Sequence, residues 1–83
     1  MQDKLKIIVF SAPWCAACQI LKKHMKEKAV EFEEVNIDED VNAVSQYGIR
    51  SLPTTIALKD DEIVMQAIGS GAVADVLEVL GQN

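Results

Sequence analysis

The hydrophobic residues of this chain form short blocks whose spacing changes along the sequence. In the first block, positions 7–10 are apolar without interruption, and we expect a strand over about residues 5–10. An apolar run that does not alternate is typical of a strand buried on both faces in the middle of a sheet.

The next block has the spacing of an amphipathic helix, from near Cys15 to about Lys28. Apolar residues that recur every three or four positions lie on one side of a helix, and the lysines of this block fall largely on the other side. The residues predicted for the inner side are Cys18, Leu21, Met25 and Ala29.

A second strand is predicted over about residues 31–37. Phe32 fits an alternating pattern at its start, whereas Val35 and Ile37 take the opposite phase. Because one extra residue in a strand reverses the phase of the side chains after it, we expect a twist or bulge between them.

The segment after this strand predicts a short helix that ends at Tyr47. One acidic residue within positions 38–40 can cap its first turn, and Gly48 stands where a helix commonly ends. We expect Val41 and Val44 to face inward.

The last third of the chain predicts a hairpin followed by a helix. Residues 54–58 and 62–68 read as two strands on either side of a turn at Asp60 and Asp61. The helix then ends at Gly81. Its expected inner residues are Val73, Val76, Leu77 and Leu80.

The predicted order of elements is β-α-β-α-β-β-α, which indicates an α/β fold in a single domain over residues 1–83. A right-handed β-α-β crossover gives two parallel strands, and the hairpin adds an antiparallel pair. Helices must then cover both faces of a four-stranded mixed sheet.

Composition narrows the class of protein. With 83 residues, 49% hydrophobic and 25% charged, the chain resembles a globular domain with a small core of its own. The net charge of −5 argues against nucleic acid as a partner, because phosphate binding needs a basic surface. The sequence has neither an apolar run long enough for a membrane nor a secretory signal pattern, so we expect a cytoplasmic monomer with no membrane partner.

Cys15 and Cys18 are the only cysteines of the chain, and two alanines separate them. They lie between the first strand and the first helix, where free backbone N–H groups and the positive end of the helix dipole favour a thiolate. The thiolate is the reactive form of cysteine. The spacing therefore predicts a pair that switches between dithiol and disulfide.

A metal site is the alternative interpretation of this pair. Structural zinc usually has four Cys or His ligands, and His24 is the only histidine of the chain. One chain therefore supplies three candidate ligands at most, and we expect neither a metal nor an organic cofactor.

Four segments of the sequence resemble the thioredoxin family, and the short length resembles glutaredoxin. The segments are residues 12–18, residues 35–38, residues 47–54 and Gly69. They occur in the family's order and span nearly the whole chain, although the family's usual N-terminal strand and helix have no counterpart in these residues. The resemblance implies a thioredoxin-like fold and a thiol-disulfide oxidoreductase that acts on disulfides of protein substrates.

The resemblance also implies roles for individual residues. Cys15 corresponds to the exposed attacking thiol and Cys18 to the buried resolving thiol. The electrons come from a reductase or from glutathione, and no cofactor is implied.

The implied substrate-binding residues lie around this pair. Trp14, after Pro13, corresponds to the aromatic residue beside the site, and Pro53 to a cis-proline that faces the two sulfurs. Leu52 would offer backbone groups to an extended substrate, and Gly69 completes the set.

The sequence departs from the family at positions that handle protons. Val9 stands where thioredoxin has a buried acid, and Glu34 stands where it has the lysine that pairs with that acid. The residues between the cysteines, Ala16 and Ala17, match neither thioredoxin nor glutaredoxin, so the family's redox potentials do not transfer. We expect Cys18 to lose its proton to water that reaches it past these small residues, rather than through Glu34.

Two other functions fit parts of the pattern. One is a glutathione-dependent, glutaredoxin-like reductase, although Ala12 stands where many glutaredoxins have a glutathione-binding lysine. The other is a non-catalytic module that holds a partner on the surface around Trp14 and Pro53. Such a module would keep its function with both cysteines replaced by serine.

Overall fold

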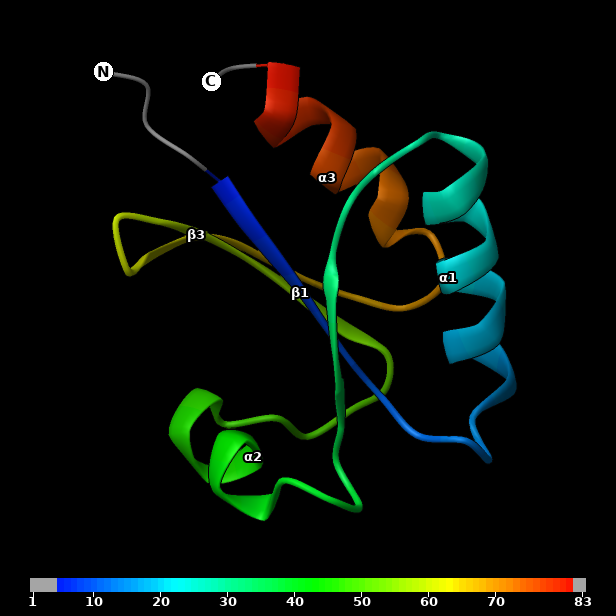
Figure 1. The fold of residues 1–83 in the computed structure, drawn as a ribbon, viewed down its shortest axis with the longest axis vertical. Coiled ribbons are helices and arrows are strands. Elements are labelled where there is room, and N and C mark those ends of the chain that lie inside the picture. The colour runs from blue at the N-terminus through cyan, green and yellow to red at the C-terminus, as the bar shows by residue number, and fades with distance from the viewer. Residues whose placement is uncertain (1–4, 82–83) are drawn as a thin grey trace.

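Seven elements follow one another in residues 5–81, the part of the chain that this computed structural model describes. Their order confirms the predicted one, and Figure 1 shows their arrangement. The elements are β1 (Leu5–Ser11), α1 (Ala16–Glu27), β2 (Glu33–Asn36), α2 (Val41–Tyr47), β3 (Thr54–Lys59), β4 (Glu62–Ile68) and α3 (Ala72–Gly81). Within these residues, no helix combines the length and the apolar character needed to cross a membrane.

The strands form one mixed sheet in the order β2-β1-β3-β4. β1 runs parallel to β2 and antiparallel to β3, and β3 and β4 form an antiparallel hairpin. β1 therefore has a neighbour on each side, as its unbroken apolar run predicts. Val9 and Phe10 in this strand are completely buried.

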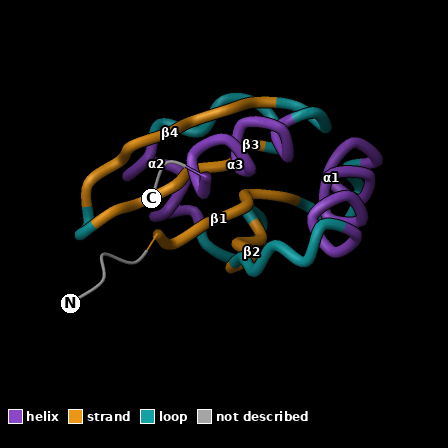
Figure 2. The backbone as a smooth tube through the Cα atoms, turned by 90° about the horizontal axis from the view of Figure 1, so that it is seen from above, coloured by secondary structure: helices purple, strands orange, loops and turns teal. Residues whose placement is uncertain are grey.

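Helices cover both faces of the sheet, and each face has its own apolar core (Figures 1 and 2). α1 and α3 pack on one face, where Leu21 and Val76 meet Val9. α2 packs on the other face, where Tyr47 contacts Phe10 with the ring centroids 5.4 Å apart. Successive residues of β1 thus pack alternately into the two cores, because side chains alternate between the two faces of a strand.

For the second strand we expected a twist or a bulge, and the prediction of a bulge is wrong. β2 pairs with β1 in continuous register from Glu33 to Asn36. Phe32 lies before the strand and packs against the core under α1 and α3, whereas Val35 and Ile37 pack on the α2 face. Even and odd positions of this segment thus face different cores, because both faces of the sheet are covered, so no inserted residue is needed.

The inner face of α1 differs from the expectation at its end. Leu21 and Met25 are buried as predicted, but Ala29 is exposed. The helix ends at Glu27, and Ala29 has a φ of 57°, so the chain turns there and brings Val30 into the core instead.

α2 begins and ends as predicted but faces the sheet with other residues. Asp40 caps the helix by accepting a hydrogen bond from the Ala43 backbone N–H, and Gly48 follows the helix with a φ of 64°. The inward expectation for Val41 is wrong, because 67% of this residue is exposed. Ala43 and Tyr47, one turn apart, contact the sheet instead.

α3 also turns a different side to the core than the spacing predicts. Val73, Val76 and Val79 pack inward, whereas Leu77 and Leu80 are 40% and 37% exposed. Val73 and Val76 are thus inward as expected, and the two leucines are not. The pattern was ambiguous because nearly every position of this helix is apolar or small, so several stripes have helical spacing.

Candidate redox site

Cys15 and Cys18 lie in the first turn of α1, directly after the loop that follows β1. Cys15 caps the helix, and its sulfur accepts a hydrogen bond from the Cys18 backbone N–H at 3.2 Å. The Cys15 N–H in turn donates to the Ala12 carbonyl at 3.1 Å, which closes the loop. The first sulfur is therefore held at the helix N-terminus, where a negative charge is favourable.

The two cysteines form a disulfide with their Cα atoms 5.3 Å apart. Such a separation is usual for a disulfide, so the backbone holds the two sulfurs ready to bond. Cys15 keeps 9% of its surface and Cys18 none. Cys15 was expected to be exposed. It is more exposed than Cys18 but is nearly buried, because Ala12 and Leu52 pack against the pair.

The loop before β3 brings Leu52, Pro53 and Gly69 together. The Leu52–Pro53 peptide bond is cis, as expected, and Leu52 packs against the cluster formed by the two cysteines and Ala12. The Gly69 N–H donates to the Pro53 carbonyl at 2.9 Å. Leu52, Pro53 and Gly69, which are distant in sequence from the two cysteines, therefore lie at the end of the sheet that carries the disulfide.

Trp14 and Pro13 are exposed in the loop between β1 and α1. Trp14 is 68% exposed, and its indole N–H donates to the Asp38 carboxylate at 3.1 Å. Asp38 was not predicted as a site residue, although it ends one of the segments shared with the family. Ile68 was also missed: it is 62% exposed and directly precedes Gly69. A large apolar residue between an alternating strand and a glycine was the signal for it.

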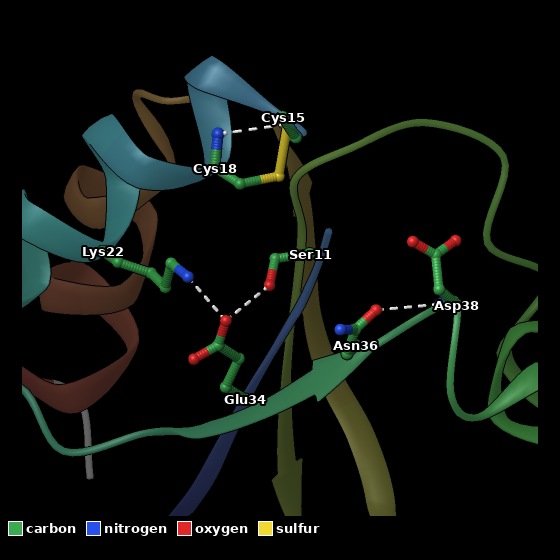
Figure 3. A network of polar contacts seen from close by, with 7 residues as sticks. All are labelled: Ser11, Cys15, Cys18, Lys22, Glu34, Asn36 and Asp38. Atoms are coloured by element: carbon green, nitrogen blue, oxygen red, sulfur yellow. Dashed lines mark hydrogen bonds and ion pairs between the residues drawn. A yellow bond between two sulfur atoms is a disulfide. The ribbon is translucent and has the colours of Figure 1, made fainter. Parts of the chain in front are cut away.

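A polar network lies between the disulfide and β2 (Figure 3). The Glu34 carboxylate accepts a hydrogen bond from the Ser11 hydroxyl at 2.8 Å and pairs with the Lys22 ammonium at 2.5 Å. These two contacts, Lys22 first, hold the pKa of Glu34 below its ordinary value of 4.5. Neither Ser11 nor Lys22 was predicted as part of the site, because sequence spacing does not reveal contacts across the sheet.

Replacing Glu34 by glutamine should lower stability only above its lowered pKa. A carboxylate whose pKa is lower in the folded than in the unfolded state stabilises the fold at neutral pH, and this contribution disappears as the pH falls from about 4.5 through the lowered pKa. Since 44% of the side chain is exposed, screening keeps the loss below about 1 kcal/mol. Urea unfolding of both proteins at neutral and acid pH measures it, and a gap that widens in acid would contradict the assignment.

The described residues contain no group of three or more His, Cys, Asp or Glu side chains arranged to hold a metal ion. Residues 5–81 bring together two sulfurs at a helix N-terminus. Around them lie an exposed indole, a cis-proline and a carboxylate network.

The comparisons with known proteins agree with this geometry. The thioredoxin family model matches residues 1–81. Thioredoxin 2 of Chlorobaculum tepidum is 36% identical over 82% of this chain and 68% of its own length. Thioredoxin of Haemophilus influenzae is 30% identical over 93% of this chain and 78% of its own.

Solved structures show the same similarity. The crystal structure of a reduced Schistosoma mansoni thioredoxin pre-protein matches with a TM-score of 0.85 and 28% identity, over 96% of this chain and 79% of that one. The Fasciola hepatica thioredoxin matches with a TM-score of 0.83 and 25% identity, over 95% and 80%. With its redox-capable Cys15–Cys18 pair, this chain belongs to the thioredoxin family and is a thiol-disulfide oxidoreductase.

Proposed function

We propose that Cys15 and Cys18 divide the reduction of protein disulfides between them. The Cys15 thiolate attacks one sulfur of the substrate disulfide, and the other substrate sulfur leaves as a thiolate. Cys18 then attacks Cys15, the mixed disulfide breaks, and the second substrate sulfur leaves. Two electrons thus pass from the dithiol to the substrate. The observation that carries this assignment is that Cys15 caps α1 and keeps some exposed surface, whereas Cys18 has none.

The surface around the pair suits an extended segment of a substrate protein. Pro13 and Trp14 directly precede Cys15 in the chain, and Leu52 packs against the cysteine pair. Leu52 leads to Pro53, whose carbonyl accepts a hydrogen bond from the Gly69 N–H. Leu52 lies in the irregular loop before β3, where its backbone groups can pair with an added strand. We propose these five residues as the substrate-binding set.

For the electron donor, we propose a protein reductase rather than glutathione. Ala12 is 1% exposed and packs against the two cysteines, so the position offers no charge to a glutathione carboxylate. We also propose that the protein acts as a monomer in the cytoplasm.

The donor is identified by mixing the oxidised protein with either candidate. A thioredoxin-reductase-type flavoenzyme with its nicotinamide should reduce the Cys15–Cys18 disulfide rapidly, and glutathione at a comparable reducing potential should do so slowly. The thiols formed are counted by alkylation and mass spectrometry. Faster reduction by glutathione would instead establish the glutaredoxin-like function.

Trp14→Ala should weaken the binding of protein substrates. An exposed tryptophan that is buried by a partner commonly contributes about 2 kcal/mol, or roughly a thirtyfold change in affinity. We therefore expect KM to rise for a protein disulfide and to change little for a small-molecule disulfide. Ile63→Ala is the matched control, because Ile63 is 47% exposed but lies near the β3–β4 turn, at the far end of the sheet. Equal effects of both variants would exclude Trp14 from the binding surface.

A further inference from the structure

Three polar side chains surround Val9, the position where the family's buried acid is missing. Val9 pairs with Glu34 on β2 and with Thr55 on β3, so the side chains of Val9, Glu34 and Thr55 lie on one face of the sheet. Ser11 lies on the same face, because it is two residues further along β1. Val9 packs against Leu21, which shows that this is the face covered by α1.

The network reaches from this buried face toward Cys18. Ser11 is completely buried, and its hydroxyl donates to the same Glu34 oxygen that pairs with Lys22. Lys22 follows Cys18 by four residues on α1, so both side chains lie on the same side of the helix. In Figure 3 the Ser11 side chain lies between Cys18 and the Glu34 carboxylate, and Ser11 and Lys22 contact the same carboxylate oxygen.

The other end of the network reaches solvent. The Glu34 side chain is 44% exposed. It lines an open hollow of about 490 Å³ between α1 and the start of β2, together with Lys22, Lys26 and Phe32. A proton that arrives at this carboxylate can therefore pass directly to water.

Thr55 provides a second, independent observation. Its residue is completely buried, and its hydroxyl has no hydrogen-bond partner among the described residues. An unsatisfied buried hydroxyl is unfavourable, and a valine of nearly the same shape would avoid that cost. In this disulfide form the Thr55 hydroxyl has no partner among the described residues, whereas reduction of the disulfide would restore an S–H donor at Cys18.

We propose that Ser11 and Glu34 relay the proton of Cys18 to solvent, and that the Thr55 hydroxyl lines the buried start of this path. This inference rests on the proposed role of Cys18 as the resolving thiol. It replaces the expectation from the sequence that water alone takes this proton, because the Ser11 contact connects Glu34 to the buried face.

As the Cys18 S–H bond breaks, its proton passes to the Ser11 oxygen while the Ser11 proton passes to Glu34, which releases it to water. The Cys18 thiolate then bonds to the Cys15 sulfur, and the substrate sulfur leaves with the electron pair of the mixed disulfide. Ser11 and Glu34 regain their starting states.

The charges around the path allow a test to distinguish a proton relay from a purely electrostatic effect of Glu34. Lys22 and Lys26 on α1 lower the pKa of Glu34. Glu33 on the same strand pairs with Lys6, and the Asp38 carboxylate accepts a hydrogen bond from the Trp14 indole N–H. Asp75 lies in the first turn of α3. An ionised Glu34 near the thiol also disfavours the Cys18 thiolate by like-charge repulsion. Its removal should therefore raise the thiolate fraction of Cys18, and a purely electrostatic role predicts a faster resolving step.

The experiment uses the reduced protein and an aromatic disulfide whose released thiolate is coloured. The first phase of colour release reports the attack by Cys15, and the second reports the attack by Cys18. For Glu34→Gln we expect the second phase to slow at least tenfold at neutral pH, although NMR titration of the Cys18 Cβ shows more thiolate. Slower resolution with more thiolate is the signature of a relay. A second phase that is unchanged or faster would overturn the proposal in favour of direct water.

Matched variants separate the relay from damage to the fold. Ser11→Ala should slow the second phase and Ser11→Thr, which keeps the hydroxyl, should not. Glu33→Gln removes an equal charge from the adjacent residue of β2 and should have no effect. Thr55→Val should unfold at higher urea concentration yet resolve more slowly, and an unchanged rate would remove Thr55 from the path. A wild-type protein without a first phase would instead refute the proposed role of Cys15.

Discussion

Cys18→Ser should leave the protein covalently attached to its substrate, and Cys15→Ser should form no such adduct. Without Cys18, nothing in the protein can attack the mixed disulfide, because these two cysteines are the only ones of the chain. Without Cys15, the remaining thiol is completely buried and cannot reach a substrate sulfur. Disulfide reduction should fall to the uncatalysed rate in both variants, so this is the largest change in activity that we predict.

The adducts are measured by mass spectrometry after mixing each reduced variant with a protein disulfide substrate and quenching with acid. The double serine variant is the control for non-covalent binding. A mixed disulfide through Cys18 in the Cys15→Ser variant would reverse the assignment of the two thiols. Full function of the double variant in its host would support the binding-module alternative.

Val9→Asp should cause the largest loss of stability, about 3–5 kcal/mol, because it places a charge with no partner of opposite sign in the core. Val9 is completely buried in the central strand β1, and its neighbour on β2 is Glu34, which carries a like charge. A loss of this size is a large fraction of the about 5–15 kcal/mol that stabilises a small domain.

The pH dependence of this loss identifies its cause. Burial raises the pKa of an introduced aspartate above its unfolded value, so the variant regains stability as the pH falls and the carboxyl becomes neutral. Urea unfolding across a pH series measures this, and Val9→Ala serves as the control for lost packing alone. A loss that is equal at neutral and acid pH would show that packing, rather than charge, determines the cost.

The sequence predicted the elements and their order because each depends on local signals. The apolar run of β1, the spacing of Leu21 and Met25, and the glycine after α2 specify structure without knowledge of the rest of the chain. The Cys-x-x-C pair was equally local, since both sulfurs belong to one helical turn.

The errors concern contacts that only the assembled sheet defines. Val41 has the spacing of an inward residue, but the angle at which α2 meets the sheet selects Ala43 and Tyr47. Likewise, Ser11 and Glu34 are 23 residues apart, and they meet only because β1 and β2 pair in parallel. A polar contact between two strands produces no periodic pattern in the sequence, so the sequence alone could not assign a hydrogen-bond partner to Glu34.

The disulfide closes a very small ring, because only two residues separate its two cysteines and both cysteines belong to the first turn of α1. Cross-links restrict the unfolded chain more when they join distant residues, so this one constrains it little. The same helix, sheet and cores therefore support both states of the redox cycle, and partners must distinguish the two states by the sulfurs and their immediate surroundings. Evolution could then adjust the driving force of electron transfer through Ala16 and Ala17 without altering the architecture.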